Sequence, residues 1–223
     1  MNIFEKIYQS NKWHVGSGEG SLTQFTKGYR DFLERFLRQH DIHSVLDFGC
    51  GDWQFSRYID WGNCHYHGVD VVPSVIENNK KMYETANRHF SLVNTETPLE
   101  HADMLLVKDV LQHWSNERIL AFLPRIRTCA YALITNCGDL PASRNTDIAD
   151  GGFRSLDLTK PPFNLRGEYV FSFRTRPVSV KNMIKWFLPR QFRELDFHNK
   201  RVLLVERHKP SSHGIRQYRE KEF

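Results

Sequence analysis

Residues 44–53 constrain the fold of this chain more than any other segment of its sequence. A short apolar run reaches Asp47, and Gly49 and Gly51 follow closely with one residue between them. Residues 54–60 then have the pattern of a helix start. A buried strand that breaks into a glycine turn leaves bare backbone at its carboxyl end, where a ligand can approach closely. The segment therefore predicts a strand–turn–helix unit with a binding site at the turn.

A second apolar segment, residues 66–71, carries Asp70 near its end. The interval from Asp47 to Asp70 is 70 − 47 = 23 residues, about the length of one strand–helix–strand unit. An acid at the end of the second strand of such a unit accepts hydrogen bonds from a nucleoside ribose. The spacing therefore predicts a cofactor that contains adenosine. The alternative is a strand-to-helix turn that binds no ligand.

The glycine pattern discriminates between adenosine cofactors. The dinucleotide fingerprint Gly-x-Gly-x-x-Gly needs a third glycine beside the pyrophosphate, and Gln54 stands at that position. This disfavours NAD and FAD. The pattern instead resembles the first motif of class I S-adenosylmethionine-dependent methyltransferases, acid-x-Gly-x-Gly-x-Gly. Asp47, Gly49 and Gly51 match that motif, and Trp53 replaces its last glycine. The resemblance, closest to small bacterial members, implies S-adenosylmethionine as the cofactor.

Strands and helices alternate along most of the chain. Residues 23–39 have the apolar spacing of an amphipathic helix, and Pro73 suits the first turn of a helix to about residue 86. Another helix is expected at 116–126, with Ser115 as its N-cap. Further strands are expected at residues 90–93, 102–107 and 131–135. The alternation predicts an α/β fold with a doubly wound, mostly parallel sheet.

The last third of the sequence differs. Between residues 138 and 178 no helical periodicity appears, so we expect an insertion after the fifth strand that contacts the acceptor. A helix is expected at 180–188, and strands at 192–197 and 201–206 with residues 198–200 as the turn. This pair resembles the closing hairpin of the family, which implies a seven-stranded sheet with an antiparallel end.

No internal repeat or low-complexity tract marks a domain boundary, so residues 1–223 are expected to form one methyltransferase domain. Residues 1–40 would be an N-terminal helical cap, and the polar segment 207–223 a mobile tail.

Composition narrows the class of protein. The hydrophobic content of 40% with 26% charged residues is that of an ordinary globular chain. No run of eighteen apolar residues is present, and residues 1–6 lack the apolar stretch of a secretory signal. The four cysteines show no Cys-x-x-Cys spacing, so we interpret them as reduced thiols of a cytoplasmic protein and not as a metal site. The net charge of +5 permits anionic partners without requiring nucleic acid.

The resemblance implies a role for each motif residue in cofactor binding. Asp47 would lie near the methionine amino group, and the turn of Gly49, Cys50 and Gly51 beneath the methionine and ribose. Asp70, followed by Val71, would accept hydrogen bonds from both ribose hydroxyls. The family often has an acid after the third strand for the adenine amino group. Asn94 occupies that place here, either as a contact or as a plain turn residue.

The segment after the fourth strand, residues 108–114, lies in this family where the methyl group meets its acceptor. Methyl transfer from a sulfonium is an in-line displacement, so the protein mainly aligns the reactants and excludes water. A hydroxyl acceptor would also need a base, and His113 is the candidate. Asp109 would orient the acceptor or touch the cofactor, and Lys108 would contact the cofactor. The alternative for His113 is a hydrogen-bonded residue at a helix start.

The glycine-rich segment 13–21 precedes the first long helix. Many relatives cover the cofactor with such a segment, and its backbone N–H groups together with Arg30 would hold the methionine carboxylate. The alternative is a flexible linker.

Residues 163–193 combine seven basic side chains with aromatic rings. They would hold a phosphorylated saccharide or an RNA backbone, or else form a solvated basic face with Phe171 and Phe173 turned inward. The favoured interpretation is methylation of an oxygen or nitrogen on a small or saccharide-like acceptor. The basic net charge is compatible with an anionic acceptor. The alternatives are an RNA methyltransferase, a catalytically silent cofactor-binding subunit and, less favoured, a nicotinamide dehydrogenase. The oligomeric state is left open.

Overall fold

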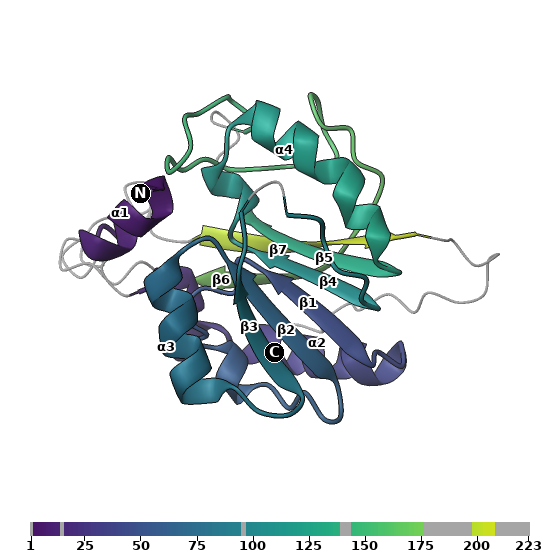
Figure 1. Ribbon diagram of the computed structural model, residues 1–223. Helices are drawn as coiled ribbons and strands as arrows, with labels where there is room; N and C mark the ends of the chain where they lie inside the picture. Colours follow the sequence, from purple (N-terminus) through teal and green to yellow (C-terminus); the bar gives the residue numbers. More distant parts are fainter. Residues whose placement is uncertain (1, 14–15, 95–96, 139–143, 176–197, 208–223) are drawn as a thin grey trace, which may run out of the picture.

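The computed structural model describes residues 2–13, 16–94, 97–138, 144–175 and 198–207. A seven-stranded sheet with the order β3-β2-β1-β4-β5-β7-β6 forms its centre (Figure 1). The strands are β1 (Ser44–Phe48), β2 (His65–Asp70), β3 (Arg88–Leu92), β4 (Met104–Lys108), β5 (Tyr131–Cys137), β6 (Glu168–Thr175) and β7 (His198–Glu206). The α-helices are α1 (Ile3–Gln9), α2 (Lys27–Gln39), α3 (Pro73–Tyr83) and α4 (Asn116–Phe122). Short 3₁₀ turns are η1 (Glu19–Ser21), η2 (Thr23–Phe25), η3 (Ser56–Tyr58), η4 (Leu111–His113) and η5 (Leu123–Thr128).

The strand pairing confirms the expected doubly wound, mostly parallel sheet. Strands β1 to β5 pair in parallel, whereas β7 pairs antiparallel with both β5 and β6. All strands except β7 therefore run in the same direction. The carboxyl ends of β1, β2 and β4 meet at one edge, with the strand order reversing between β1 and β4, and this is where ligands bind in open α/β sheets.

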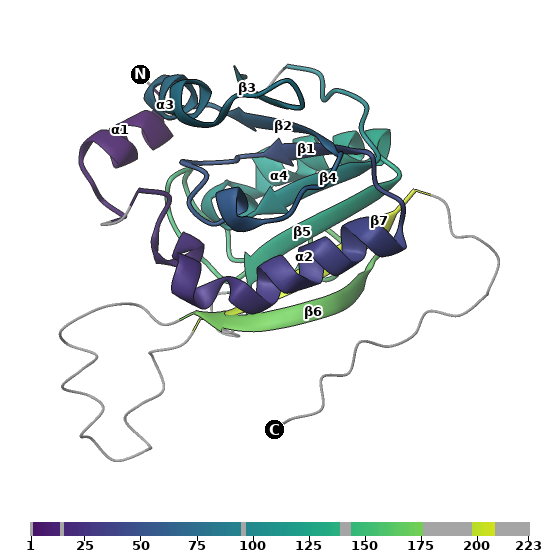
Figure 2. The same cartoon turned by 90° about the horizontal axis from the view of Figure 1, so that it is seen from below.

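Two apolar layers enclose the sheet, with α2 and α4 on opposite faces (Figures 1 and 2). Helix α2 buries residues at three- and four-residue steps, as its sequence predicts. Its Phe32 ring stacks on Phe171 of β6 with the centroids 4.7 Å apart, and Tyr29 stacks on Phe173 at 4.9 Å. These two rings of β6 are thus turned toward the core. No helix in the described ranges is both long and apolar enough to cross a membrane.

The expected helix at 54–60 was wrong, because the structure has only the single turn η3 there. Trp53 has a positive φ of 59° just before it, which interrupts the regular backbone. The indole nitrogen of Trp61 donates to the carbonyl of Ser56 at 2.9 Å and closes this short segment. Phe55 and Ile59 consequently both reach the core without a continuous helix.

The expected turn at residues 198–200 was also wrong, because these residues belong to β7. The strand that forms a hairpin-like antiparallel pair with β7 at the sheet edge is β6, which lies within the expected insertion 138–178. The polar run His198-Asn199-Lys200 has the composition of a turn. Lys200 is nevertheless buried in β7, where it forms an ion pair with Asp109, a residue distant in sequence. The helix expected at 180–188, the strand at 192–197 and nearly all of the tail 207–223 lie outside the described residues.

Candidate active site

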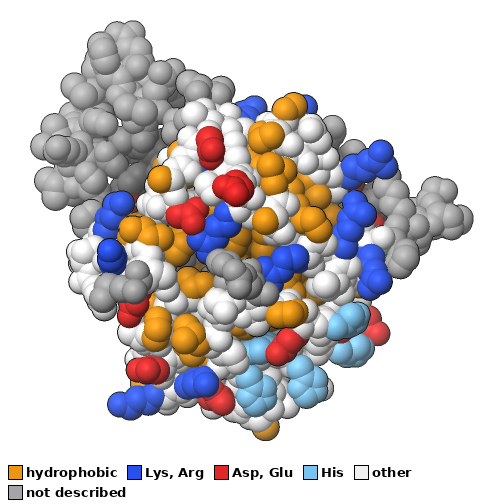
Figure 3. Space-filling model, turned by 45° about the horizontal axis from the view of Figure 1, so that its top comes forward, with side chains coloured by type: hydrophobic (Ala, Val, Ile, Leu, Met, Phe, Trp, Pro, Cys, Tyr) orange, Lys and Arg blue, Asp and Glu red, His pale blue; other side chains and the backbone are white. Residues whose placement is uncertain are grey.

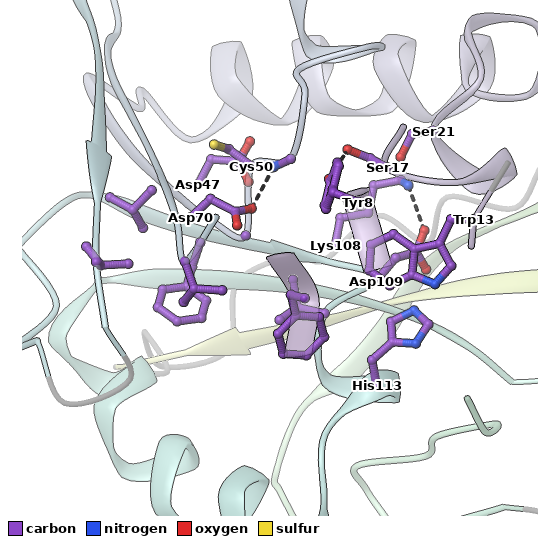
Figure 4. A pocket seen from close by; sticks show the side chains of 18 of the residues that line it. Tyr8, Trp13, Ser17, Ser21, Asp47, Cys50, Asp70, Lys108, Asp109 and His113 are labelled. Atoms are coloured by element: carbon purple, nitrogen blue, oxygen red, sulfur yellow. Dashed lines mark hydrogen bonds and ion pairs between the residues drawn. The ribbon is translucent and has the colours of Figure 1, made fainter. Parts of the chain in front are cut away.

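A cavity opens at the carboxyl ends of β1, β2 and β4, beside residues 2–13 and 16–21, which we call the N-terminal segment (Figure 4). It contains about 800 Å³ of space outside the protein atoms, open solvent at its mouth included. Nine of the predicted site residues line it together: Asp47, Gly49, Cys50, Gly51, Asp70, Val71, Lys108, Asp109 and His113.

Asp47, on β1, is buried at the floor of this cavity. Its Oδ2 accepts a hydrogen bond of 2.5 Å from the hydroxyl of Tyr66. Burial raises the pKa of Asp47 to about 7, although the Tyr66 hydrogen bond and the charge of Lys108 oppose this. A cation bound beside this carboxyl group would favour its ionised form.

In the glycine turn after β1, other side chains approach the backbone closely and both glycines have positive φ angles. Gly49 has φ 79°, and a Cβ added there would lie 2.3 Å from Val110. Gly51 has φ 56°, and a Cβ there would lie 2.1 Å from the hydroxyl of Ser17. Only glycine fits both demands. Trp53, at the position of the family's last glycine, has the same left-handed backbone with φ 59°.

Asp70 ends β2, lines the cavity and lies directly beside the glycine turn (Figure 4). Its Oδ2 accepts from the backbone N–H of Gly51 at 3.0 Å, and its Oδ1 from that of Val72 at 3.1 Å. Burial raises the pKa of Asp70, while these backbone hydrogen bonds lower it. Each carboxylate oxygen keeps accepting capacity for a further donor, as a ribose diol requires.

The N-terminal segment is hydrogen-bonded across the glycine turn. Ser17 donates its hydroxyl to Asp52 at 2.6 Å and accepts from the Asp52 N–H at 2.8 Å. Tyr8 on α1 shares a 2.7 Å hydrogen bond with the same Ser17 hydroxyl. The side chain of Asn2 donates to the carbonyl of Val71 at 2.6 Å. The segment therefore lies over the cavity, with Tyr8, Trp13, Ser17 and Ser21 in its wall.

A cluster of three charges, Lys108, Asp109 and Lys200, lies at the carboxyl end of β4. Lys108 donates to Asp109 Oδ2 at 2.7 Å and to the carbonyl of Gly20 at 2.9 Å. Lys200, from β7, donates to Asp109 Oδ1 at 2.6 Å. Burial alone would raise the pKa of Asp109, but the two lysine charges hold it well below its usual value. Asp109 has a positive φ of 59°, a backbone conformation that costs free energy outside glycine.

His113 has a defined tautomer. Its Nδ1 lies 2.7 Å from the carbonyl of Gly152, so Nδ1 carries the proton. Gln112 accepts from the N–H of Cys137 through Oε1, which places its amide nitrogen 3.3 Å from His113 Nε2. Burial lowers the pKa of His113 to about 4. The imidazole is therefore neutral near pH 7, with its acceptor nitrogen facing the Gln112 amide.

Two predicted cofactor residues do not line the cavity. Arg30 donates to the carbonyl of Thr23 and to the hydroxyl of Thr26, at 3.1 and 3.2 Å. Asn94 accepts from the N–H of Thr97 at 2.7 Å. Sequence reasoning missed Lys200 and Tyr8, because strand pairing and the docking of α1 bring them to the site from distant parts of the chain.

Comparison with known proteins adds a family match to this geometry. Residues 46–129 match a family model described as "Methyltransferase domain". No curated protein sequence matches the chain. The matched residues run from β1 through the 108–114 segment, and so include most of the cavity residues named above.

Solved structures share the fold at low sequence identity. A putative sarcosine dimethylglycine methyltransferase from Galdieria sulphuraria aligns with a TM-score of 0.55 at 13% identity, covering 80% of this chain and 85% of that one. Human N-acetylserotonin methyltransferase with S-adenosylmethionine gives 0.55 at 14%, covering 93% of this chain and 59% of that one. Magnesium protoporphyrin IX methyltransferase from Synechocystis PCC 6803, with bound S-adenosylhomocysteine, gives 0.51 at 13%, covering 93% and 89%. The methyltransferase-domain match covers residues 46–129 of a sheet with this strand order, so this part of the chain is similar to methyltransferase domains.

Proposed function

We propose that this enzyme transfers the methyl group of S-adenosylmethionine to an oxygen or nitrogen of a small-molecule or saccharide-like acceptor. The observation that carries the proposal is that the N-terminal segment, held by hydrogen bonds between Ser17 and Asp52, forms part of the cavity wall. A partly covered cavity with aromatic rings in its wall fits a small acceptor better than a polymer. The three solved methyltransferases above are named for small-molecule substrates, in agreement with this proposal.

The donor is proposed to lie along the sheet edge. Asp70 would hold the ribose diol, because its two oxygens still have accepting capacity. Asp47 would ionise as it pairs with the methionine ammonium. Lys108, a cation in the cavity wall, would bind the methionine carboxylate, a role that the sequence suggested for Arg30. Val71 and Val93, which also line the cavity, would contact the adenine ring.

At the other end of the cavity, His113 and Asp109 would border the acceptor. The sulfonium charge already activates the methyl carbon, so the protein needs to align donor and acceptor and to exclude water. Trp13, whose ring centroid lies 5.2 Å from that of His113, would help to exclude it.

An RNA acceptor has less support. On the face shown in Figure 3, basic and acidic side chains are interspersed among apolar ones and do not form a continuous basic surface of the described residues. Phe171 and Phe173, candidates for base stacking, pack against α2 instead. The rest of the basic stretch 163–193 lies largely outside the described residues.

Calorimetric titration with S-adenosylmethionine, S-adenosylhomocysteine and NAD tests the proposed donor. We expect both sulfur compounds to bind, NAD not to bind, and Asp70→Ala to weaken donor binding at least tenfold. Transfer of a tritiated methyl group to a small-metabolite extract but not to RNA would support the acceptor class. Labelling of RNA alone would contradict it, and a failure to label either would favour the silent-subunit alternative.

A further inference from the structure

Lys200 lies outside the cavity wall but is bound to a residue that belongs to it. Its ammonium donates to Asp109 Oδ1 at 2.6 Å, and the residue is only 4% exposed. In β7 it pairs with Cys137 of β5 and with Phe173 of β6, so its backbone is hydrogen-bonded on both sides. A lysine is almost never buried in this way without a charged partner. One oxygen of Asp109 is therefore held from an inner strand of the sheet.

The other oxygen of Asp109 is bound by Lys108. Both residues line the cavity (Figure 4). The Lys108 ammonium donates to Asp109 Oδ2 at 2.7 Å and to the carbonyl of Gly20 at 2.9 Å. An ammonium has three N–H groups, and these two hydrogen bonds use two of them. The third can donate to a ligand in the cavity.

Asp109 is held in its orientation from several sides. Its backbone has a left-handed φ of 59°, and its N–H donates to the carbonyl of Thr135 at 2.9 Å. Gly20 packs closely over the carboxylate, since a Cβ added there would lie 3.0 Å from Asp109 Oδ2 and 3.5 Å from Lys200 Cε. The N-terminal segment and β7 thus meet at this carboxylate, and only its Oδ2 is directed at Lys108.

This division of one carboxylate between two lysines affects how strongly Lys108 can attract another anion. A carboxylate that turned both oxygens toward Lys108 would neutralise the ammonium and compete with a ligand carboxylate for its N–H groups. Lys200 prevents this, because it binds one oxygen and shares the negative charge. Asp47 and Asp70 line the same cavity and add their own charges to it, but the structure has no hydrogen bond from either lysine to them.

We propose that Lys200 is a positioning residue for donor binding, which holds Asp109 so that Lys108 can bind the methionine carboxylate. This proposal rests on the proposed methyltransferase function and adds to it a residue that does not line the cavity. Lys200 acts only through Asp109. The alternative is an ion pair that stabilises the fold without affecting the ligand, and the two roles predict different patterns of binding.

A matched pair of ligands measures what the carboxylate contributes. S-adenosylmethionine and its decarboxylated form share the nucleoside, the sulfonium and the ammonium, and only the first has a carboxylate. In calorimetric titrations we expect the unaltered protein to bind S-adenosylmethionine about tenfold more tightly. In Lys200→Met this ratio should fall to about one, because S-adenosylmethionine binds more weakly while the decarboxylated ligand keeps its affinity. Asp47 and Asp70 are present in both proteins, so their charges cancel in the comparison.

Further variants test whether the effect passes through Asp109. Combining Lys200→Met with Asp109→Asn removes the carboxylate that would neutralise Lys108, so the preference for S-adenosylmethionine should return. A double variant without this preference would mean that Lys200 attracts the ligand directly, which contradicts the proposal. Lys27→Met removes an exposed lysine of α2 by the same change and should retain the preference.

An unchanged ratio in Lys200→Met, or an equal loss of affinity for both ligands, would overturn the proposal in favour of a structural ion pair. Equal affinities of the unaltered protein for the two ligands would also overturn it. If Lys200→Met does not fold, Asp109→Asn alone gives the test, since it should retain the preference and its loss would contradict the proposal. If neither S-adenosylmethionine nor S-adenosylhomocysteine binds the unaltered protein, the methyltransferase proposal itself fails, so the two failures are distinguishable.

Discussion

Trp53 occupies a backbone conformation that the family motif reserves for glycine. The left-handed region costs a residue with a side chain about 1–2 kcal/mol. The indole is 1% exposed and packs on Tyr66, Tyr83 and Phe90, with ring centroids 4.9 to 5.6 Å away. Burial of so large a ring contributes more than the backbone strain costs, so the motif accommodates this departure.

Substitutions at Trp53 should separate these two effects. Trp53→Ala removes the ring but keeps the strain, and we expect a loss of about 3–5 kcal/mol in unfolding free energy. Trp53→Gly removes both, so its loss should be about 1 kcal/mol smaller. Urea unfolding measures both values. A glycine variant that is less stable than the alanine variant would show that backbone strain has no part in this position.

The raised pKa of Asp47 makes donor binding depend on pH. With a pKa of about 7, this carboxyl is largely protonated below pH 7, whereas its proposed pairing with the donor ammonium requires the ionised form. Binding below pH 7 must then release a proton, so affinity should rise with pH, by up to tenfold per unit, and level off above pH 7. Asp70, whose pKa is also raised, acts in the same direction.

Calorimetry at pH 5 to 8, in buffers of different ionisation enthalpy, measures both the affinity and the released proton. Asp47→Asn should bind the donor more weakly and show a shallower slope. An unchanged slope in that variant would assign the titration to another group.

In the proposed function, the N-terminal segment and the glycine turn would together cover the donor. Asp52 does not line the cavity, yet it accepts from both the N–H and the hydroxyl of Ser17. We expect Asp52→Ala to accelerate dissociation of S-adenosylmethionine about tenfold, because hydrogen bonds to a charged group contribute about 1.5–3 kcal/mol each. Stopped-flow displacement measures the rate. Asp31→Ala, which removes an exposed acid of α2, serves as the control, and equal rates in the two variants would argue against a cover.

Elements with a strong local pattern were predictable from the sequence. Pro73 at the start of α3 and Ser115 before α4 correspond to observed boundaries. The helix predicted over 23–39 begins at Lys27 instead, because residues 23–25 form the separate turn η2. The predicted helix at 54–60 failed because the backbone of Trp53 cannot be read from residue type. The pairing of β6 with β7 was missed because a buried ion pair, and not local composition, holds Lys200 in a strand.

The residues of the candidate site also fall into a group that the sequence predicts and a group that it does not. Residues within contiguous motifs, such as Asp47 and Asp70, come together because the carboxyl ends of parallel strands share an edge. Side chains that reach the site through tertiary packing, such as Tyr8 and Lys200, carry no local signal. Arg30 was assigned from charge alone, and its guanidinium is bonded within the α2 region instead.

Across the whole molecule, β7 connects the two apolar layers. Leu203 belongs to the layer on the α4 side and Leu204 to the layer on the α2 side, because neighbouring strand residues point to opposite faces. We expect Leu203→Ala and Leu204→Ala each to cost about 2–4 kcal/mol of unfolding free energy. The double variant should show the sum within about 0.5 kcal/mol, since the two side chains share no packing layer. Urea unfolding tests this, and strong non-additivity would mean that the layers are coupled through the strand.

The position of β7 also affects how a newly made chain reaches its native state. In order of synthesis this strand follows β5 and β6, yet it lies between them. Until residues 198–206 have left the ribosome, the inner edges of both neighbours present unsatisfied backbone groups. A nascent chain in that interval offers a ready template for intermolecular strand addition, and chaperone binding there would protect it from aggregation.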